Sequence, residues 1–173
     1  MVRDALASRR RLGQGPVPLA EYVPPASIVA ASLLAALPIV VNSGWFPDFG
    51  FLVLIGWRLL RADPFPAWWA APLGLVNDLA TGNPIGFSVA LWSATMLALD
   101  LIDRRTMWRD YWIEWVLAAV FILLHEWLQW LIAAATGAEL PAISLFPPVL
   151  ISIFTFPIAA WMVSRIDQWR LGR

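Results

Sequence analysis

The stretch Gly74-Leu-Val-Asn-Asp-Leu-Ala-Thr-Gly-Asn-Pro-Ile-Gly86 lies between two strongly apolar segments of the chain. It places Asn77 and Asp78 in what would otherwise be a membrane helix, and the turn Thr81-Gly82-Asn83-Pro84 follows directly. Glycine, asparagine and proline stop a helix and permit unusual backbone angles. The stretch therefore predicts a tight hairpin between two helices.

The composition around this hairpin is that of a membrane protein. The chain has 173 residues, of which 60% are hydrophobic, and its mean hydropathy is +0.69. A chain of this size cannot bury so much apolar surface in a core of its own, so lipid must cover the remainder. The absence of cysteine excludes disulfides, thiol catalysis and cysteine–metal sites.

Apolar segments divide the chain into candidate membrane spans. A helix needs about 20 apolar residues to cross a bilayer, and the last three segments meet this length easily, whereas the second and third are short. The pattern predicts an all-α membrane protein that folds as a bundle of six transmembrane helices. The segments lie near Ala26–Ser43, Trp45–Leu60, Pro66–Ala80, Ile85–Asp103, Trp112–Thr136 and Ile143–Ser164.

The positions of the arginines predict the topology. All twelve basic residues are arginines, and every one falls before the first segment, after the sixth, or on alternate loops between them. The opposite loops carry only Asp48 and Glu139. The positive-inside rule then places both termini in the cytoplasm. We expect a flexible cytoplasmic arm over residues 1–25, a transmembrane domain over 26–164 and a short basic tail over 165–173.

The acid of the hairpin needs a partner, because a carboxylate in the last turn of a helix is opposed by the helix dipole and by nearby hydrocarbon. The turn is short enough for Asp78 to accept from backbone N–H groups around Ile85 to Phe87. That interaction would lock the hairpin; the alternative is contact with a partner or ligand from the outer side. The motif residues are Gly74, Asn77, Asp78, Gly82, Pro84 and Gly86.

A second polar group lies near the middle of the fifth segment, where His125, Glu126 and Gln129 share overlapping helix faces. An ionised acid at the bilayer centre costs about 2.5–3.5 kcal/mol. Glu126 is therefore protonated, bonded to a neutral group, or exposed to a water-filled cavity. Together with residues of other segments these side chains predict an outward-opening polar pocket, or else a cluster that merely holds helices together. The predicted neighbours are Asn42, Asn77, Asp78, Ser88 and Trp92.

Sequence motifs for catalysis are lacking. A zinc-binding His-Glu-x-x-His pattern needs a second histidine, and the chain has one. It also lacks a glycine-rich phosphate loop and a nucleotide-binding motif. We expect no catalytic residue, no cofactor, no metal and no nucleic acid partner.

The chain resembles the MreD family of rod shape-determining membrane proteins. The likeness rests on the N-terminal anchor, Pro47-Asp-Phe-Gly-Phe-Leu-Val-Leu at the entry to the second segment, Gly74-x-x-x-Asp78-Leu79, Gly82-x-x-x-Gly86 and the basic tail. The resemblance implies a fold like the substrate-capture subunits of energy-coupling vitamin importers. It also implies a non-enzymatic role in cell-wall elongation in the bacterial inner membrane. The implied partners are the scaffold MreC and, through it, MreB and the wall synthases.

Two other functions remain open: a small-molecule-binding transporter subunit with an outward-facing pocket, and a bare assembly factor whose polar groups only lock the bundle. For the scaffold function, we expect the main activity to be holding a partner's transmembrane helix within the lipid bilayer. Small residues permit close approach of helices. The expected partner-helix contacts are Gly50, Gly56 and Gly74.

Overall fold

The protein is described by a computed structural model over residues 20–37, 46–60, 66–105, 110–137 and 141–171. Every regular element in these ranges is helical, so the all-α prediction is confirmed there. Asn42, Glu139 and most of the predicted N-terminal arm lie outside the described residues. The elements are η1 (Ala20–Tyr22), α2 (Val23–Leu34), α4 (Phe49–Leu60), η2 (Ala67–Trp69), α5 (Ala70–Thr81), α6 (Phe87–Arg105), α7 (Tyr111–Ala135), η3 (Ala142–Leu145) and α8 (Phe146–Arg170).

Two stretches of the described chain are long and apolar enough to cross a membrane: α7, and η3 together with α8. In contrast, α2, α4 and α5 have 12 residues each. At the rise of an α-helix this length covers about 18 Å, less than the hydrocarbon core of about 30 Å. The crossing of the membrane by six spans therefore stays a prediction.

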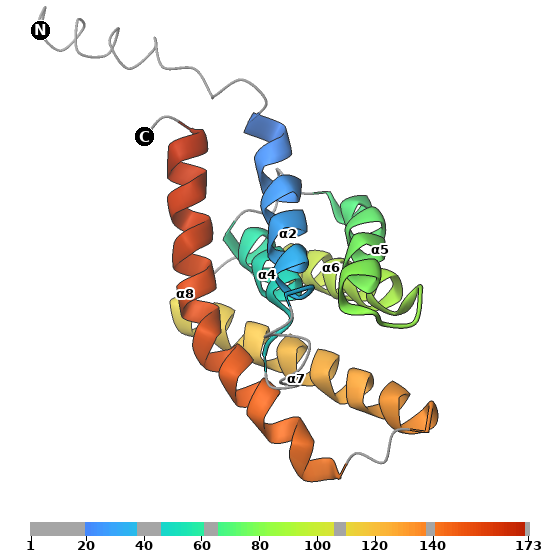
Figure 1. Cartoon of the computed structure of the whole chain (residues 1–173). Coiled ribbons are helices and arrows are strands. Elements are labelled where there is room, and N and C mark those ends of the chain that lie inside the picture. The colour runs from blue at the N-terminus through green and yellow to red at the C-terminus, as the bar shows by residue number, and fades with distance from the viewer. Residues whose placement is uncertain (1–19, 38–45, 61–65, 106–109, 138–140, 172–173) are drawn as a thin grey trace, which may run out of the picture.

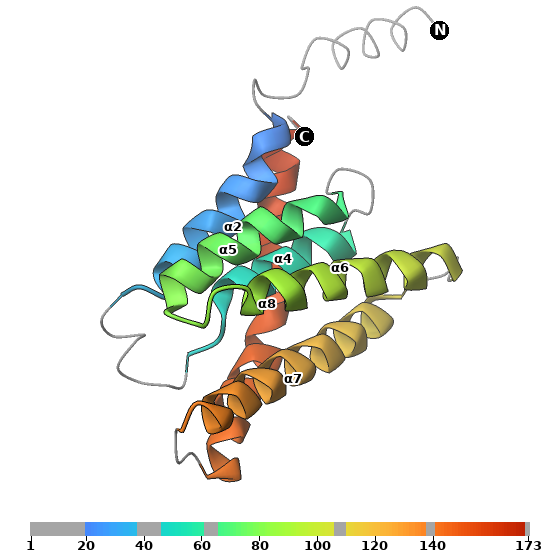
Figure 2. The same ribbon diagram turned by 90° about the vertical axis from the view of Figure 1, so that its right-hand side faces the viewer.

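The helices alternate in direction through the bundle. Helix α2 packs against α4 and α5, α5 packs against α6, and α8 packs against both α4 and α7. Figure 2 shows α5 ending and α6 beginning at the left, with the far end of α6 at the right and α7 returning to the left. The start of α2 and the end of α8 both lie at the top in Figure 1. An even number of crossings between them would place these two helix ends in this way.

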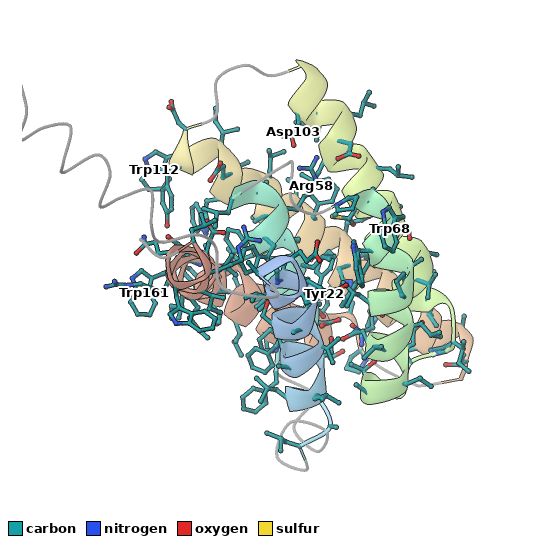
Figure 3. All side chains as sticks on the ribbon, turned by 90° about the horizontal axis from the view of Figure 1, so that it is seen from above. Tyr22, Arg58, Trp68, Asp103, Trp112 and Trp161 are labelled. Carbon is teal, nitrogen blue, oxygen red and sulfur yellow. The ribbon has the colours of Figure 1, made fainter. Side chains whose placement is uncertain are left out.

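The core forms where α4 meets its neighbours, because nine of its twelve residues are buried. Phe51, Leu54 and Ile55 pack in one hydrophobic cluster with Trp92 of α6 and Ile122 of α7. Large aromatic residues also remain outside this core. Trp68, Trp112 and Trp161 lie at the periphery of the bundle in Figure 3, with 65%, 69% and 59% of their surfaces exposed.

At its far end α4 is joined to α6 by ion pairs. Arg58, which was expected on a loop between two spans, lies in the last turn of α4 and is 2% exposed. Its guanidinium contacts Asp100, and Nη2 lies 2.9 Å from Asp103 Oδ2. Figure 3 shows Arg58 and Asp103 beside each other at the ends of the two helices. A charge of this kind is tolerated in the interior because it is paired.

Trp57 joins the first and last helices of the described chain. Its indole N–H donates to Ser27 Oγ of α2 at 2.8 Å. The Arg170 guanidinium of α8 lies over the same ring, with Cζ 5.3 Å from the centroid. Arg170 also donates to the Ala20 carbonyl at 3.4 Å and pairs with Asp167 at 2.6 Å. Trp57 thus contacts α2 through its polar N–H and α8 through its π face.

The three glycines expected to contact a partner helix instead serve the bundle itself. All three are buried. A Cβ on Gly56 would lie 3.2 Å from Val163 Cγ2 of α8, and one on Gly50 would collide with Ser32 Oγ of α2. A Cβ on Gly74 would lie 2.7 Å from the Ser88 backbone. The expectation is therefore wrong for this structure, because helices of the same chain occupy the space that a partner would need.

Candidate functional site

The α5–α6 hairpin contains the hydrogen bonds expected of Asp78. Its Oδ2 accepts from the Gly86 N–H and its Oδ1 from the Ser88 N–H, both at 2.8 Å. The carboxylate is 1% exposed. These donors belong to the start of α6, where the free N–H groups of a helix favour an anion. Both carboxylate oxygens are therefore satisfied by the neighbouring helix, and the hairpin is closed by the acid.

The turn between the two helices depends on backbone conformations that glycine adopts readily. Gly82 has φ of 73° and donates to the Asp78 carbonyl, which caps α5 in the left-handed conformation. Gly86 has φ of 100°. No described atom would meet a Cβ at either position within 4 Å. Both glycines are therefore required by φ rather than by space. At the end of the turn, the Pro84 carbonyl accepts from the Phe87 N–H at 3.0 Å.

Asp48 stands at the centre of a buried network beside the hairpin. It precedes α4, and its Oδ1 accepts from the Phe51 N–H at 3.0 Å, as an N-cap residue does. Its Oδ2 accepts from Asn77 Nδ2 at 2.8 Å. The same Nδ2 lies 3.1 Å from Ser88 Oγ. One carboxylate therefore links the start of α4 to α5 and, through Asn77, to α6.

His125 brings α7 into this network. Its Nε2 lies 3.3 Å from Asp48 Oδ2, and the side chain is 1% exposed. The imidazole stacks on the Phe51 ring at 4.3 Å between centroids and also lies near the Phe87 ring at 5.8 Å. The imidazole is therefore enclosed by two aromatic rings on α4 and α6 and by the Asp48 carboxylate.

Glu126 and Gln129, which follow His125 on α7, face different neighbours. Ser152 Oγ of α8 donates to Glu126 Oε1 at 3.5 Å. Gln129 Nε2 donates to Asn83 Oδ1 in the hairpin turn at 3.4 Å. The predicted pocket is therefore divided, because adjacent helical positions point about 100° apart. Of the three states considered for Glu126, contact with a neutral group is the one observed.

The polar atoms of this region that have no hydrogen-bond partner among the described residues include Ser32 Oγ, Asn77 Oδ1 and Trp92 Nε1. Each belongs to a residue that is 0% exposed. Asn77 Oδ1 would lie 2.9 Å from a Cβ on Gly50, next to Ser32 Oγ. Buried polar atoms of this kind are sites where water or a polar ligand is stabilised.

The sequence did not indicate Ser32 or Ser152 as residues of the site. It also did not indicate the central role of Asp48. Asp48 was placed on an outer loop, yet its side chain is 8% exposed. A signal was present, because an aspartate directly before an apolar helical segment is a common N-cap and its carboxylate turns inward over the first turn. Ser32 and Ser152 carry no comparable signal, since single serines are frequent in membrane helices.

Fold and site together define an all-helical protein with two helices of membrane length and polar side chains paired inside the bundle. In the described ranges no group of three metal-binding side chains comes together. Asp48 is surrounded by N–H donors, which stabilise an anion rather than bind a cation. Comparison with protein-family models, curated proteins and solved structures finds no match to this chain.

Proposed function

We propose that the protein is a non-catalytic, multi-pass membrane component of the bacterial rod-shape machinery. In this proposal it resides in the inner membrane with both termini in the cytoplasm and binds the transmembrane helix of an MreC-like scaffold. It thereby helps to organise wall synthesis. The proposal rests first on the resemblance of the hairpin and span layout to the MreD family.

The observation that carries the proposal is the pairing of polar side chains within the bundle. Asp78 is bonded to the hairpin backbone, Asn77 and His125 contact Asp48, and Glu126 contacts Ser152. Groups used in this way fix helices relative to one another, as interhelical hydrogen bonds do in membranes. A bundle joined in this way, with a large apolar surface, fits a protein that holds another helix.

The alternative function is a small-molecule-binding transporter subunit. The observation that favours it is the group of unpartnered atoms between α2, α5 and α6, namely Ser32 Oγ, Asn77 Oδ1 and Trp92 Nε1. They supply both acceptors and a donor, which is what a small polar ligand requires. Under this alternative the hairpin would serve as the wall of a binding site.

Purification from native membranes in a mild detergent separates the two functions. The affinity-tagged protein is isolated, and the sample is divided for mass spectrometry of proteins and of small molecules. The scaffold function predicts a single-span partner in near-equal amount. An Asp78→Ala variant is the matched control, because an opened hairpin should lose the partner.

Recovery of a stoichiometric small molecule without a single-span protein would overturn the scaffold proposal. In that case the double variant Ser32→Ala, Asn77→Leu should abolish ligand recovery. Recovery of neither class from a monodisperse preparation would leave the bare assembly factor as the function and would likewise contradict the scaffold proposal.

A further inference from the structure

Helix α7 is attached to the rest of the bundle in two different ways along its length. Near its start, the Trp115 indole donates to the Ile153 carbonyl of α8 at 3.3 Å. Near its end, His125 and Gln129 reach Asp48 and Asn83, which belong to the α4–α6 part of the chain. The second half of α7 is therefore held to α4 and to the hairpin by His125 and Gln129, and to α8 by Glu126.

The central contact of this second half is incompletely satisfied. Nε2 of His125 is at 3.3 Å from the Asp48 carboxylate, and neither ring nitrogen makes a hydrogen bond in the described part of the chain. Buried charge pairs lose much of their attraction to desolvation, and partly satisfied polar networks are weaker than apolar packing of the same volume. The Asp48–His125 pair therefore specifies where α7 sits without holding it firmly.

The opposite face of α7 is open. Val120, Leu123 and Trp127 are 56%, 50% and 45% exposed. About half of each side chain is free of protein contact on this face, so α7 has room to move away from α4 into lipid. Another acid lies close to the pair: Glu126, the next residue of α7, which is bonded to Ser152 of α8.

We propose that the Asp48–His125 pair is a releasable joint, at which the second half of α7 turns away from α4 and opens the polar interior to the outer aqueous phase. Release breaks the Asp48–His125 contact and the His125–Phe51 stack together, while the Trp115–Ile153 and Glu126–Ser152 bonds keep α7 on α8. The joint gives the bundle two states: a closed state, in which His125 contacts Asp48 as in the structure, and an open state, in which this contact is broken. Access to Ser32 and Asn77 would then be controlled by α7.

The chain lacks cysteine, so single-cysteine labelling tests the joint. Ile122→Cys is the reporter, because Ile122 lies on α7 and is 1% exposed. A membrane-impermeant maleimide is added from the outer side. Asp48→Asn retains an N-cap acceptor without the charge, and His125→Phe retains a ring for stacking on Phe51. Each should speed labelling by about tenfold, which corresponds to about 1.4 kcal/mol.

The double variant Asp48→Asn, His125→Phe should label no faster than either single variant, because both remove one interaction. Ala118→Cys, buried on the first half of α7, should stay slow in all backgrounds. Unchanged Ile122→Cys labelling in the single variants, additive acceleration in the double variant, or equal acceleration at Ala118→Cys would each overturn the joint. Hydrogen exchange of α7 in the cysteine-free chain provides the same comparison if Ile122→Cys does not fold.

Discussion

The Asp78 carboxylate accepts the backbone N–H of Ser88 at 2.8 Å, so a side chain from the last turn of α5 caps the first turn of α6. The neighbouring oxygen accepts from Gly86. The acid is thus the element that closes the hairpin, and the two helices it joins are the most extensively packed pair in the bundle.

Replacement of Asp78 tests this closure. Asp78→Ala leaves two buried N–H groups without an acceptor and should lower the free energy of unfolding by about 1–3 kcal/mol. Asp78→Asn keeps one carbonyl oxygen and should lose less. Thermal melting of the purified variants in one detergent measures both. Equal, wild-type-like melting of the two variants would show that the bonds contribute nothing to stability.

Gly74 tests the close approach of α5 and α6. A Cβ at this position lies 2.7 Å from the Ser88 carbonyl, which cannot move without displacing α6. Gly74→Ala should therefore reduce the melting temperature, and Gly74→Leu should prevent stable folding. Leu75→Ala, at an exposed position on the same helix, is the control and should melt like the wild type. A stable, monodisperse Gly74→Leu protein would contradict the packing described.

The Arg58 guanidinium tests the pairing of α4 with α6. Arg58→Ala leaves Asp100 and Asp103 without their shared cation, and removal of one partner of a buried pair costs about 3–5 kcal/mol. The loss should fall at the lower end, since the Asp100 side chain is 35% exposed. Adding Asp100→Asn and Asp103→Asn should restore part of it. Chemical unfolding provides the values, and no rescue by the added changes would argue against the pairing.

Topology is tested by cysteine accessibility. Asn83→Cys in the hairpin turn should react with an impermeant maleimide added outside intact cells, because the arginines favour the opposite side. Gln168→Cys, exposed on the last turns of α8, should react only after the cells are opened. Labelling of Asn83→Cys only in opened cells would reverse the orientation. Labelling of both positions from outside would require an even number of crossings between them.

Local chemistry was sufficient to predict the hairpin. The breakers Gly82 and Pro84 and the acid Asp78 lie within a few residues of one another, so their interaction follows from the turn itself. The all-helical architecture likewise follows from long apolar segments. The second and third apolar segments, which correspond to α4 and α5, were predicted to be short, although their predicted starts lie a few residues before the helices begin.

Contacts between distant segments were not predictable. Asp48 and His125 meet because α4 and α7 cross at a particular rotation, and one sequence contains no signal for that rotation. The same reason explains the errors on Gly50, Gly56 and Gly74. Small residues indicate that some helix approaches closely, but they do not indicate whether it belongs to this chain or to another.

The position of Trp57 between Ser27 and Arg170 has a consequence for how the protein is made. During synthesis α2 and α4 emerge before α8 and can form the Ser27–Trp57 bond, whereas Arg170 reaches the ring only after α8 has been made. The ring lacks its cation until then. A chain that stops before Arg170 would keep the Ser27–Trp57 bond without the guanidinium over the ring, so the surroundings of this one tryptophan report whether α8 is complete.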